Sequence, residues 1–297
     1  MTRACAAALL GMAVTVTGAQ QTFRTTTDVV LLPVTVLGRG NTLIRGLTQA
    51  DFEVFEDGKR QTVTFFGEGA VASVPLHLGL LLDTSTSMQK ELAAATTAAI
   101  RFVNALDEAV DVTFVDFATE VRVSRFSPAS YPHLFERMRD HKADGYTALY
   151  DAVALYLSSV SEQDGLKVLL LYSDGEDSTS STTYGQMSEM LRLSDVMVYA
   201  IGYLDGLTGS SRGMSQLRLN DLAHQTGGEA FYPMGGGPLT EIYARIKDEI
   251  SSRYTLGFTS TNTTADGKWR KLEVRATSPA AKGAKVRSRP GYFAPAR

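Results

Sequence analysis

The chain has 297 residues, of which 44% are hydrophobic and 21% are charged, and these values are ordinary for a globular protein with a sizeable core. A chain of this length forms one large domain or two modest ones. The formal net charge of −3 excludes the strongly basic surface that nucleic-acid binding requires, so we expect no nucleic-acid partner.

The first residues have the pattern of a cleaved secretory signal. Arg3 supplies a positive charge, residues 4–16 are mostly apolar, and residues 17–19 are small. The apolar run is shorter than the roughly 18 residues that a membrane span needs, and no later run has that length. We therefore expect a signal peptide over residues 1–19, a secreted or periplasmic protein, and no transmembrane segment after cleavage. The single cysteine, Cys5, lies in this signal, so the mature chain is expected to form no disulfide.

Residues 20–72 are predicted to be β structure. Residues 29–36 are mostly apolar and β-branched, and alternating patterns over 52–56 and 61–65 flank an Asp-Gly pair at 57–58. Asp-Gly between two alternating stretches is a strong hairpin signal, because both residues tolerate positive φ angles.

Residues 73–252 have a different pattern, in which short apolar stretches alternate with stretches of helical spacing. Repeated strand and helix units favour a mainly parallel, Rossmann-like sheet with helices on both faces, an α/β fold. The predicted strands are 78–82, 110–115, 121–126, 168–171 and 196–201, and the predicted helices lie over 92–106, 149–160 and 239–250.

Residues 253–297 return to a β pattern. Alternation over 254–258 and 272–276 surrounds an Asp-Gly turn at 266–267, and residues 285–292 are a last candidate strand. The N-terminal and C-terminal β segments are each small for an independent sandwich. We therefore expect them to pair into one small β-sandwich-like domain beside the central α/β domain.

The predicted strand ending at Leu82 is followed at once by Asp83, Ser85 and Ser87. This spacing places one carboxylate and two hydroxyls in one turn at the carboxyl end of a strand, where parallel α/β sheets bind ligands. These hard oxygen donors suit Mg²⁺, although three of them do not fill its octahedral shell. Each residue type is also a good helix cap, which is the alternative for this motif taken alone.

Two further loops can supply the missing ligands. Thr147 offers a hydroxyl in the loop before a predicted helix, and Asp174 offers a second carboxylate after the strand 168–171. Both loops are expected on the same rim of the sheet. The sequence therefore predicts a metal site formed by Asp83, Ser85, Ser87, Thr147 and Asp174.

The three motifs together resemble the von Willebrand factor type A family. The resemblance covers about residues 74–252 and rests on Asp-x-Ser-x-Ser at 83–87, on the threonine loop at 144–152 and on Ser-Asp-Gly-Glu-Asp at 173–177. The flanking segments, 46–58 and 289–292, resemble a bacterial subgroup of secreted members of this family.

The resemblance implies a metal-dependent adhesion site with one open coordination position, which a carboxylate of a partner protein fills. Mg²⁺ is the expected metal, with Mn²⁺ and Ca²⁺ as alternatives. Loops 178–185, 205–213 and 227–238 are expected to be mobile surfaces that select the partner. The expected function is a secreted adhesion or binding protein.

Two alternatives remain open at this level. The chain can be a structural scaffold of an envelope assembly, in which the β domain makes the contacts. It can also be a serine hydrolase using Ser85 or Ser87, although neither serine lies in a Gly-x-Ser-x-Gly elbow and no P-loop or paired histidine metal spacing occurs. We therefore expect no enzyme.

Overall fold

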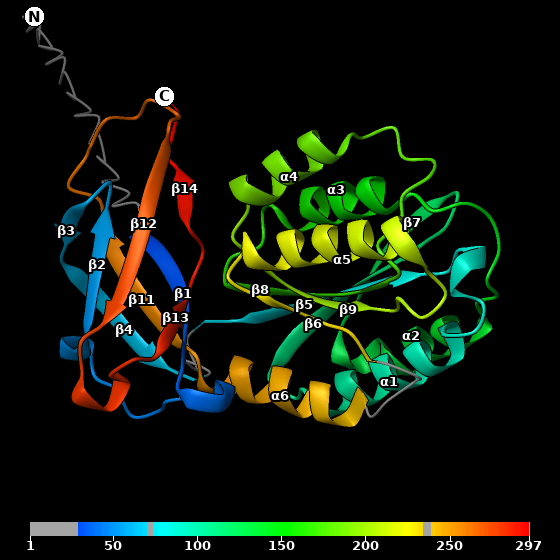
Figure 1. Cartoon of the computed structure of the whole chain (residues 1–297), viewed down its shortest axis with the longest axis horizontal. Helices are drawn as coiled ribbons and strands as arrows, with labels where there is room; N and C mark the ends of the chain where they lie inside the picture. The colour runs from blue at the N-terminus through cyan, green and yellow to red at the C-terminus, as the bar shows by residue number, and fades with distance from the viewer. Residues whose placement is uncertain (1–28, 70–73, 234–238, 297) are drawn as a thin grey trace, which may run out of the picture.

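The computed structural model describes residues 29–69, 74–233 and 239–296. A β sandwich and an α/β unit lie side by side (Figure 1). The expected signal peptide, residues 1–19, lies outside the described residues. Within the described part of the chain, no helix has both the length and the apolar character needed to cross a membrane.

A six-stranded sheet forms the centre of the α/β unit, with the strand order β10-β9-β8-β5-β6-β7. All neighbouring strands are parallel except β6 and β7, which are antiparallel. Strand β8 is buried along its whole length, which fits the continuous apolar stretch at residues 168–171. The strands are β5 (Leu76–Asp83), β6 (Ala109–Phe117), β7 (Val121–Phe126), β8 (Leu166–Ser173), β9 (Val196–Gly202) and β10 (Glu229–Phe231).

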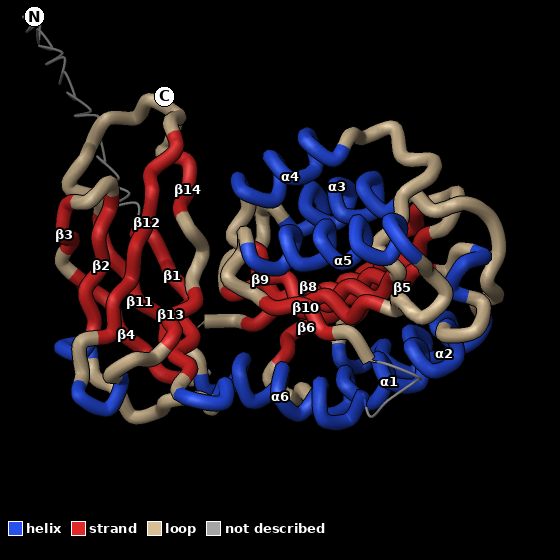
Figure 2. Tube along the Cα trace, in the orientation of Figure 1, coloured by secondary structure: helices blue, strands red, loops and turns tan. Residues whose placement is uncertain are grey.

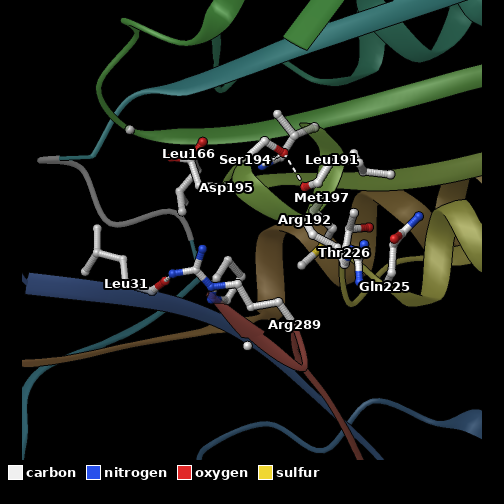
Figure 3. A pocket seen from close by; sticks show the side chains of 14 residues that line it. Leu31, Leu166, Leu191, Arg192, Ser194, Asp195, Met197, Gln225, Thr226 and Arg289 are labelled. Atoms are coloured by element: carbon white, nitrogen blue, oxygen red, sulfur yellow. Dashed lines mark hydrogen bonds between the residues drawn. The ribbon is translucent and has the colours of Figure 1, made fainter. Parts of the chain in front are cut away.

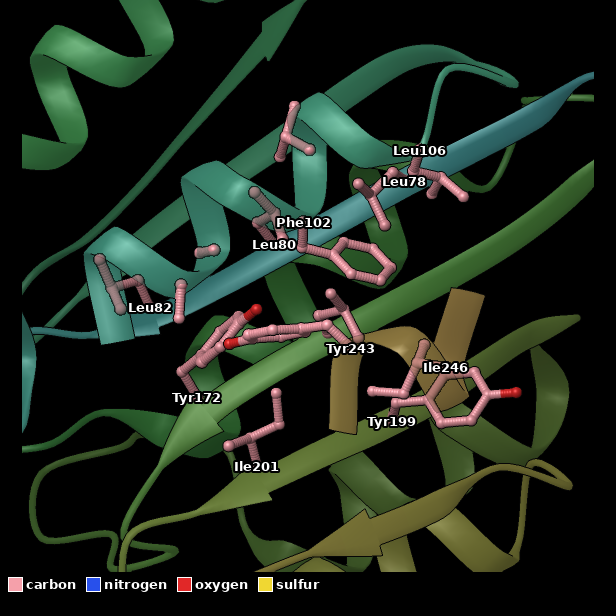
Figure 4. Packing of buried hydrophobic residues seen from close by; sticks show 14 of the residues in the cluster. Leu78, Leu80, Leu82, Phe102, Leu106, Tyr172, Tyr199, Ile201, Tyr243 and Ile246 are labelled. Atoms are coloured by element: carbon pink, nitrogen blue, oxygen red, sulfur yellow. The ribbon is translucent and has the colours of Figure 1, made fainter. Parts of the chain in front are cut away.

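Helices cover both faces of this sheet (Figure 2). On one face pack α1 (Leu92–Ala105), α2 (Tyr131–Asp140) and α6 (Leu239–Ser252). On the other face pack α3 (Leu149–Val160), α4 (Tyr184–Leu193) and α5 (Gly209–His224). In the first of these layers, Phe102 of α1 and Tyr243 of α6 have ring centroids 5.4 Å apart (Figure 4). The predicted α/β fold class is confirmed, although the sequence pattern did not indicate α2, α4, α5 or β10.

The β sandwich consists of two antiparallel sheets, with the orders β13-β1-β11-β4 and β14-β12-β2-β3. Each sheet combines strands from before and after the α/β unit, because β1 pairs with β11 and β2 pairs with β12. The strands are β1 (Val29–Leu37), β2 (Phe52–Glu56), β3 (Lys59–Gln61), β4 (Val63–Glu68), β11 (Tyr254–Thr259), β12 (Trp269–Ala276), β13 (Lys285–Arg287) and β14 (Gly291–Phe293). Short 3₁₀ turns occupy Arg39–Asn41, Gln49–Asp51, Thr86–Met88, Pro128–Ser130 and Pro279–Ala281.

Two of the predicted strands are each divided between the two sheets. The predicted strand 61–65 is interrupted at Thr62, where the chain passes from β3 in one sheet to β4 in the other. The predicted strand 285–292 is likewise divided into β13 and β14. The expectation of two continuous strands was therefore wrong, since a strand that turns a corner of a sandwich keeps its alternating pattern while it changes sheets.

Helix α6 connects the two units directly. It ends at Ser252, and Arg253 leads at once into β11 of the sandwich. Arg253 is only 2% exposed, and its Nη1 lies 3.8 Å from the Sδ of Met197 in β9. The junction between the units is therefore buried and contains charged groups.

Candidate functional site

Asp83 is the last residue of β5 and is fully buried. Its Oδ1 accepts hydrogen bonds from the backbone N–H of Ser85 at 3.0 Å and from the Ser85 hydroxyl at 2.5 Å. The next residue, Thr84, donates its N–H to the carbonyl of Phe117 at the end of β6, at 2.8 Å. These bonds turn the chain sharply where β5 ends and hold the carboxylate at the rim of the sheet.

The two serines of the first motif face the same point. The hydroxyl oxygens of Ser85 and Ser87 lie 3.1 Å apart. Ser85 is buried beside Asp83, whereas Ser87 is exposed. The turn therefore presents a carboxylate and two hydroxyls that run from the interior to the surface, as the spacing predicted.

Asp174 directly follows β8, the neighbour of β5 in the sheet, and is 3% exposed. Its Oδ1 accepts the N–H of Glu176 at 2.9 Å, which fixes the turn after the strand. The hydroxyl of Ser173, the last residue of β8, donates to Oδ2 of Asp83 at 2.6 Å. Each oxygen of Asp83 is thus held by a serine, one from its own turn and one from the next strand.

Sequence reasoning missed Ser173. Its hydroxyl also accepts the N–H of Gly175 at 3.0 Å, so it links Asp83 to the turn that carries Asp174. The signal available in the sequence was a hydroxyl residue immediately before Asp174, at the end of an apolar strand. In the structure Ser173 positions the Asp83 carboxylate.

Thr147 lies in the loop before α3 and is 5% exposed. Its loop is joined to the first motif by two backbone hydrogen bonds, from Thr86 N–H to the Gly145 carbonyl at 3.1 Å and from Asp144 N–H to the Thr84 carbonyl at 2.9 Å. Its backbone N–H donates to the hydroxyl of Ser178 in the loop after β8, at 3.0 Å. The structure therefore brings the three predicted segments together at the carboxyl ends of the strands.

The loop after β8 is held against α3. Both carboxylate oxygens of Asp151, in the first turn of α3, accept backbone N–H groups, from Ser181 and from Thr182, each at 2.8 Å. Burial acts to raise the pKa of Asp151, but these hydrogen bonds outweigh it and lower the pKa. The loop 178–185 is expected from its composition to be mobile, yet the structure ties its first half to a helix.

Electrostatics at the site favour a cation. Burial, and secondarily the negative charge of Asp174, raise the pKa of Asp83 to about 7. Two buried carboxylates at one rim repel each other, and a cation between them removes that cost. The oxygens of these carboxylates and of the neighbouring hydroxyls are donors that fit Mg²⁺.

The sequence profile of the von Willebrand factor type A domain matches residues 77–245, which is more than half of the chain. The chain belongs to this family. The predicted membership is confirmed, and the matched region corresponds to the α/β unit.

Three solved structures of similar fold come from bacteria. A von Willebrand factor type A protein from Catenulispora acidiphila has a TM-score of 0.51 and 12% identity, over 90% of this chain and 72% of that one. The pilus adhesin SpaC from Lactobacillus rhamnosus GG has a TM-score of 0.51 and 10% identity, over 87% of this chain and 49% of that one. The PilB minor pilin from Streptococcus sanguinis, as its D319A mutant, has a TM-score of 0.48 and 15% identity, over 60% of this chain.

The chain spans 62% of that pilin's length and about half of the SpaC adhesin. At these identities the likeness concerns the fold. No curated protein matches the chain by sequence.

Proposed function

We propose that the protein is a secreted, metal-dependent binding protein. Its site holds Mg²⁺, for which Mn²⁺ or Ca²⁺ can substitute, and the bound metal binds a carboxylate of a partner protein. The observation that carries this proposal is the convergence of Asp83 and Asp174, both buried, with the serine hydroxyls at one rim of the sheet. Burying two carboxylates so close together is costly unless a cation accompanies them.

The residues that would hold the metal come from three segments: Asp83, Ser85 and Ser87 from the turn after β5, Thr147 from the loop before α3, and Asp174 from the turn after β8. The two carboxylates balance the charge of a divalent ion without exceeding it. Such an ion still attracts an anion. Water completes the coordination of Mg²⁺ in most protein sites, and one water can give way to a carboxylate of the partner.

The family and its structural neighbours support a role in adhesion or protein interaction rather than catalysis. SpaC, whose structure resembles this chain in fold, is a pilus adhesin. A hydrolase role for Ser85 has little support. Its hydroxyl forms hydrogen bonds with Asp83 and Ser87, and none with a histidine of the described residues. We therefore propose that the protein binds a partner and catalyses no reaction.

Calorimetric titration of Mg²⁺ into the chelator-stripped protein tests the metal. We expect saturable binding at one site, and loss of that binding in Asp83→Ala. Asp107→Ala is a matched control, since Asp107 is exposed and precedes β6 at the opposite end of the strands. Absence of binding for Mg²⁺, Mn²⁺ and Ca²⁺ alike would refute the proposed site.

Partner binding needs a separate experiment. If binding of an isolated partner persists in chelator and in Asp83→Ala, the protein is a scaffold whose contacts lie elsewhere. If binding requires metal, the adhesion site is the contact.

A further inference from the structure

A groove of about 580 Å³ lies where the β sandwich meets the end of α4. Its sandwich side is lined by residues 29–31 of β1 and by residues 292–295, and its other side by Leu193 and Asp195. A smaller cavity of about 40 Å³ shares Leu31, Asp195 and Arg289 with the groove (Figure 3). A hollow of this size at the junction of two units is typical of a binding site. None of its residues belongs to the candidate metal centre.

The groove contains open strand edges. One side of β1 pairs with β11 along residues 29–34, while β13 covers the other side only at residues 35–37. No described strand pairs with that second side along residues 29–33. Strand β14 pairs with β12 on one side, and none of the described strands pairs with its other side. An open edge presents unpaired N–H and C=O groups, which an added strand can bind.

Arg289 projects into this region as a charged group. Its Nη2 donates to the carbonyl of Leu31 at 3.1 Å, and its guanidinium lies 5.8 Å from the ring centroid of Tyr292. Its Nε is buried without a hydrogen-bond partner, and no carboxylate of the described residues forms an ion pair with it. Burial lowers the pKa of Arg289, yet arginine stays charged in proteins.

The nearby Asp195 acts on Arg289 by its negative charge, which works against the lowering of the Arg289 pKa, but the two side chains form no ion pair. Both of its carboxylate oxygens are bound by Nζ of Lys167, at 2.7 and 3.0 Å. A partly buried guanidinium without an ion-pair partner is costly, and a carboxylate that binds it through two parallel hydrogen bonds offsets that cost. The groove therefore selects for a negatively charged ligand.

We propose that this groove binds an extended peptide segment of a partner protein, which adds to the open edge of β1 and presents a carboxylate to Arg289. The carbonyl of Leu31 points toward the groove, because it accepts a hydrogen bond from Arg289. In a β strand the N–H and the C=O of one residue lie on the same side, so the N–H of Leu31 also points toward the groove. The residues of β1 that line the groove, 29–31, span about 10 Å as a strand, so the pairing is short and ends before Pro33, which has no N–H and lines the smaller cavity. Thr259, Ser260 and Asn262 add polar groups to the lining.

Fluorescence anisotropy tests the proposal with the full chain in the presence of chelator. The probe is a set of labelled heptapeptides of alternating valine and threonine, with one glutamate placed at each position in turn. We expect at least one peptide to bind, and its affinity to fall about tenfold or more when the glutamate is replaced by glutamine. N-methylation of alternate backbone amides of that peptide should weaken binding similarly, because it removes the donors to the strand edge.

The protein variants separate recognition from folding. Arg289→Gln should bind the glutamate and glutamine peptides equally. Arg275→Gln is the control, because Arg275 belongs to an exposed ion pair of β12, and this variant should keep the preference for glutamate. Asp83→Ala should also keep it, so failure of the proposed metal site leaves this result unaffected. If Arg289→Gln does not fold, the wild-type amide resonance of Leu31 serves instead, and it should shift when the peptide is added.

Several results would overturn the proposal. These are no binding by any peptide, equal binding of the N-methylated peptide, or a preference for glutamate that survives in Arg289→Gln. Competition by propionate as strong as by the peptide would identify a site for small carboxylates instead. Self-association that Arg289→Gln abolishes would identify a second copy of the chain as the occupant.

Discussion

Arg287, the last residue of β13, donates a hydrogen bond to the buried carboxylate of Glu249 in α6. The same oxygen of Glu249 accepts the hydroxyl of Tyr199 at 2.9 Å. Arg287 also donates to Glu229 of β10, and to the carbonyl of Gly227 at 3.1 Å. A buried ionic network therefore links the C-terminal part of the sandwich to the last helix and the edge strand of the α/β unit.

Replacing Arg287 by methionine should destabilise the protein strongly. The change leaves Glu249, which is fully buried, with only the longer ion pair to Arg245, whose Nε lies 3.6 Å from its Oε1. Removing one partner of a buried ion pair costs about 3–5 kcal/mol. The free energy of unfolding, measured in urea, should fall by that amount.

The exposed pair Arg275–Glu273 is the matched control, because exposed ion pairs contribute about 1 kcal/mol or less. The double variant Arg287→Met with Glu249→Met should recover much of the loss, since no unpaired charge then stays buried. A loss below about 1 kcal/mol in Arg287→Met alone would show that Arg245 is a sufficient partner for Glu249, or that Glu249 is solvated or protonated.

Ser173→Ala should weaken metal binding without abolishing it. The serine touches Asp83 and the turn after β8, and it positions the carboxylate rather than holding the metal. Loss of such a supporting hydrogen bond typically costs about 10- to 100-fold in metal affinity. Calorimetry of Mg²⁺ binding measures this, with Ser159→Ala as the control, because the hydroxyl of Ser159 donates within α3. An unchanged affinity would show that the turn of β5 alone orients Asp83.

Metal binding should depend on pH in the neutral range. The pKa of Asp83 is raised from its ordinary 3.8 to about 7, first by burial and then by Asp174. Below about pH 7 the metal-free protein holds a proton that the metal must displace, so affinity should fall about tenfold per pH unit as the pH decreases. For the same reason, the metal-free protein should lose stability as the pH rises between 3.8 and about 7.

Thermal unfolding with and without Mg²⁺, at about pH 6 and about pH 8, checks the direction of both pH effects, the one on metal affinity and the one on the stability of the metal-free protein. Stabilisation by Mg²⁺ should be larger at the higher pH. Asp83→Asn, a neutral side chain of the same shape, should lose the pH dependence of stability that arises from this carboxyl. Stabilisation that is equal at both pH values would place the titrating group elsewhere.

The sequence allowed β5, β6, β8 and β9 to be predicted because these strands are short, mostly apolar and mostly buried. Helix α2 was missed since only Leu134 and Met138 of its residues are buried, so its apolar face is too sparse to recognise. The fold class and the family are confirmed, and the five metal-site residues come together in segments that share hydrogen bonds. Their role in holding a metal stays a prediction.

Contacts between distant parts of the chain could not be read from sequence patterns. Arg287 and Glu249 are 38 residues apart and belong to different units, and Ser173 and Asp83 are 90 residues apart. In both cases one polar residue at a strand end gives no periodic signal. Its role depends on which strand the fold places beside it.

Two glycine-to-alanine changes should have opposite effects on stability. A Cβ on Gly79 of β5 would lie 2.4 Å from the ring of Tyr156, a buried residue of α3, so Gly79→Ala forces the helix away from the sheet. Such overpacking costs about 1–3 kcal/mol. A Cβ on Gly213, in the interior of α5, meets no atom within 4 Å, so Gly213→Ala should stabilise the protein by up to about 1 kcal/mol. Urea unfolding of both variants measures the difference, and equal effects would mean that α3 does not pack directly on β5.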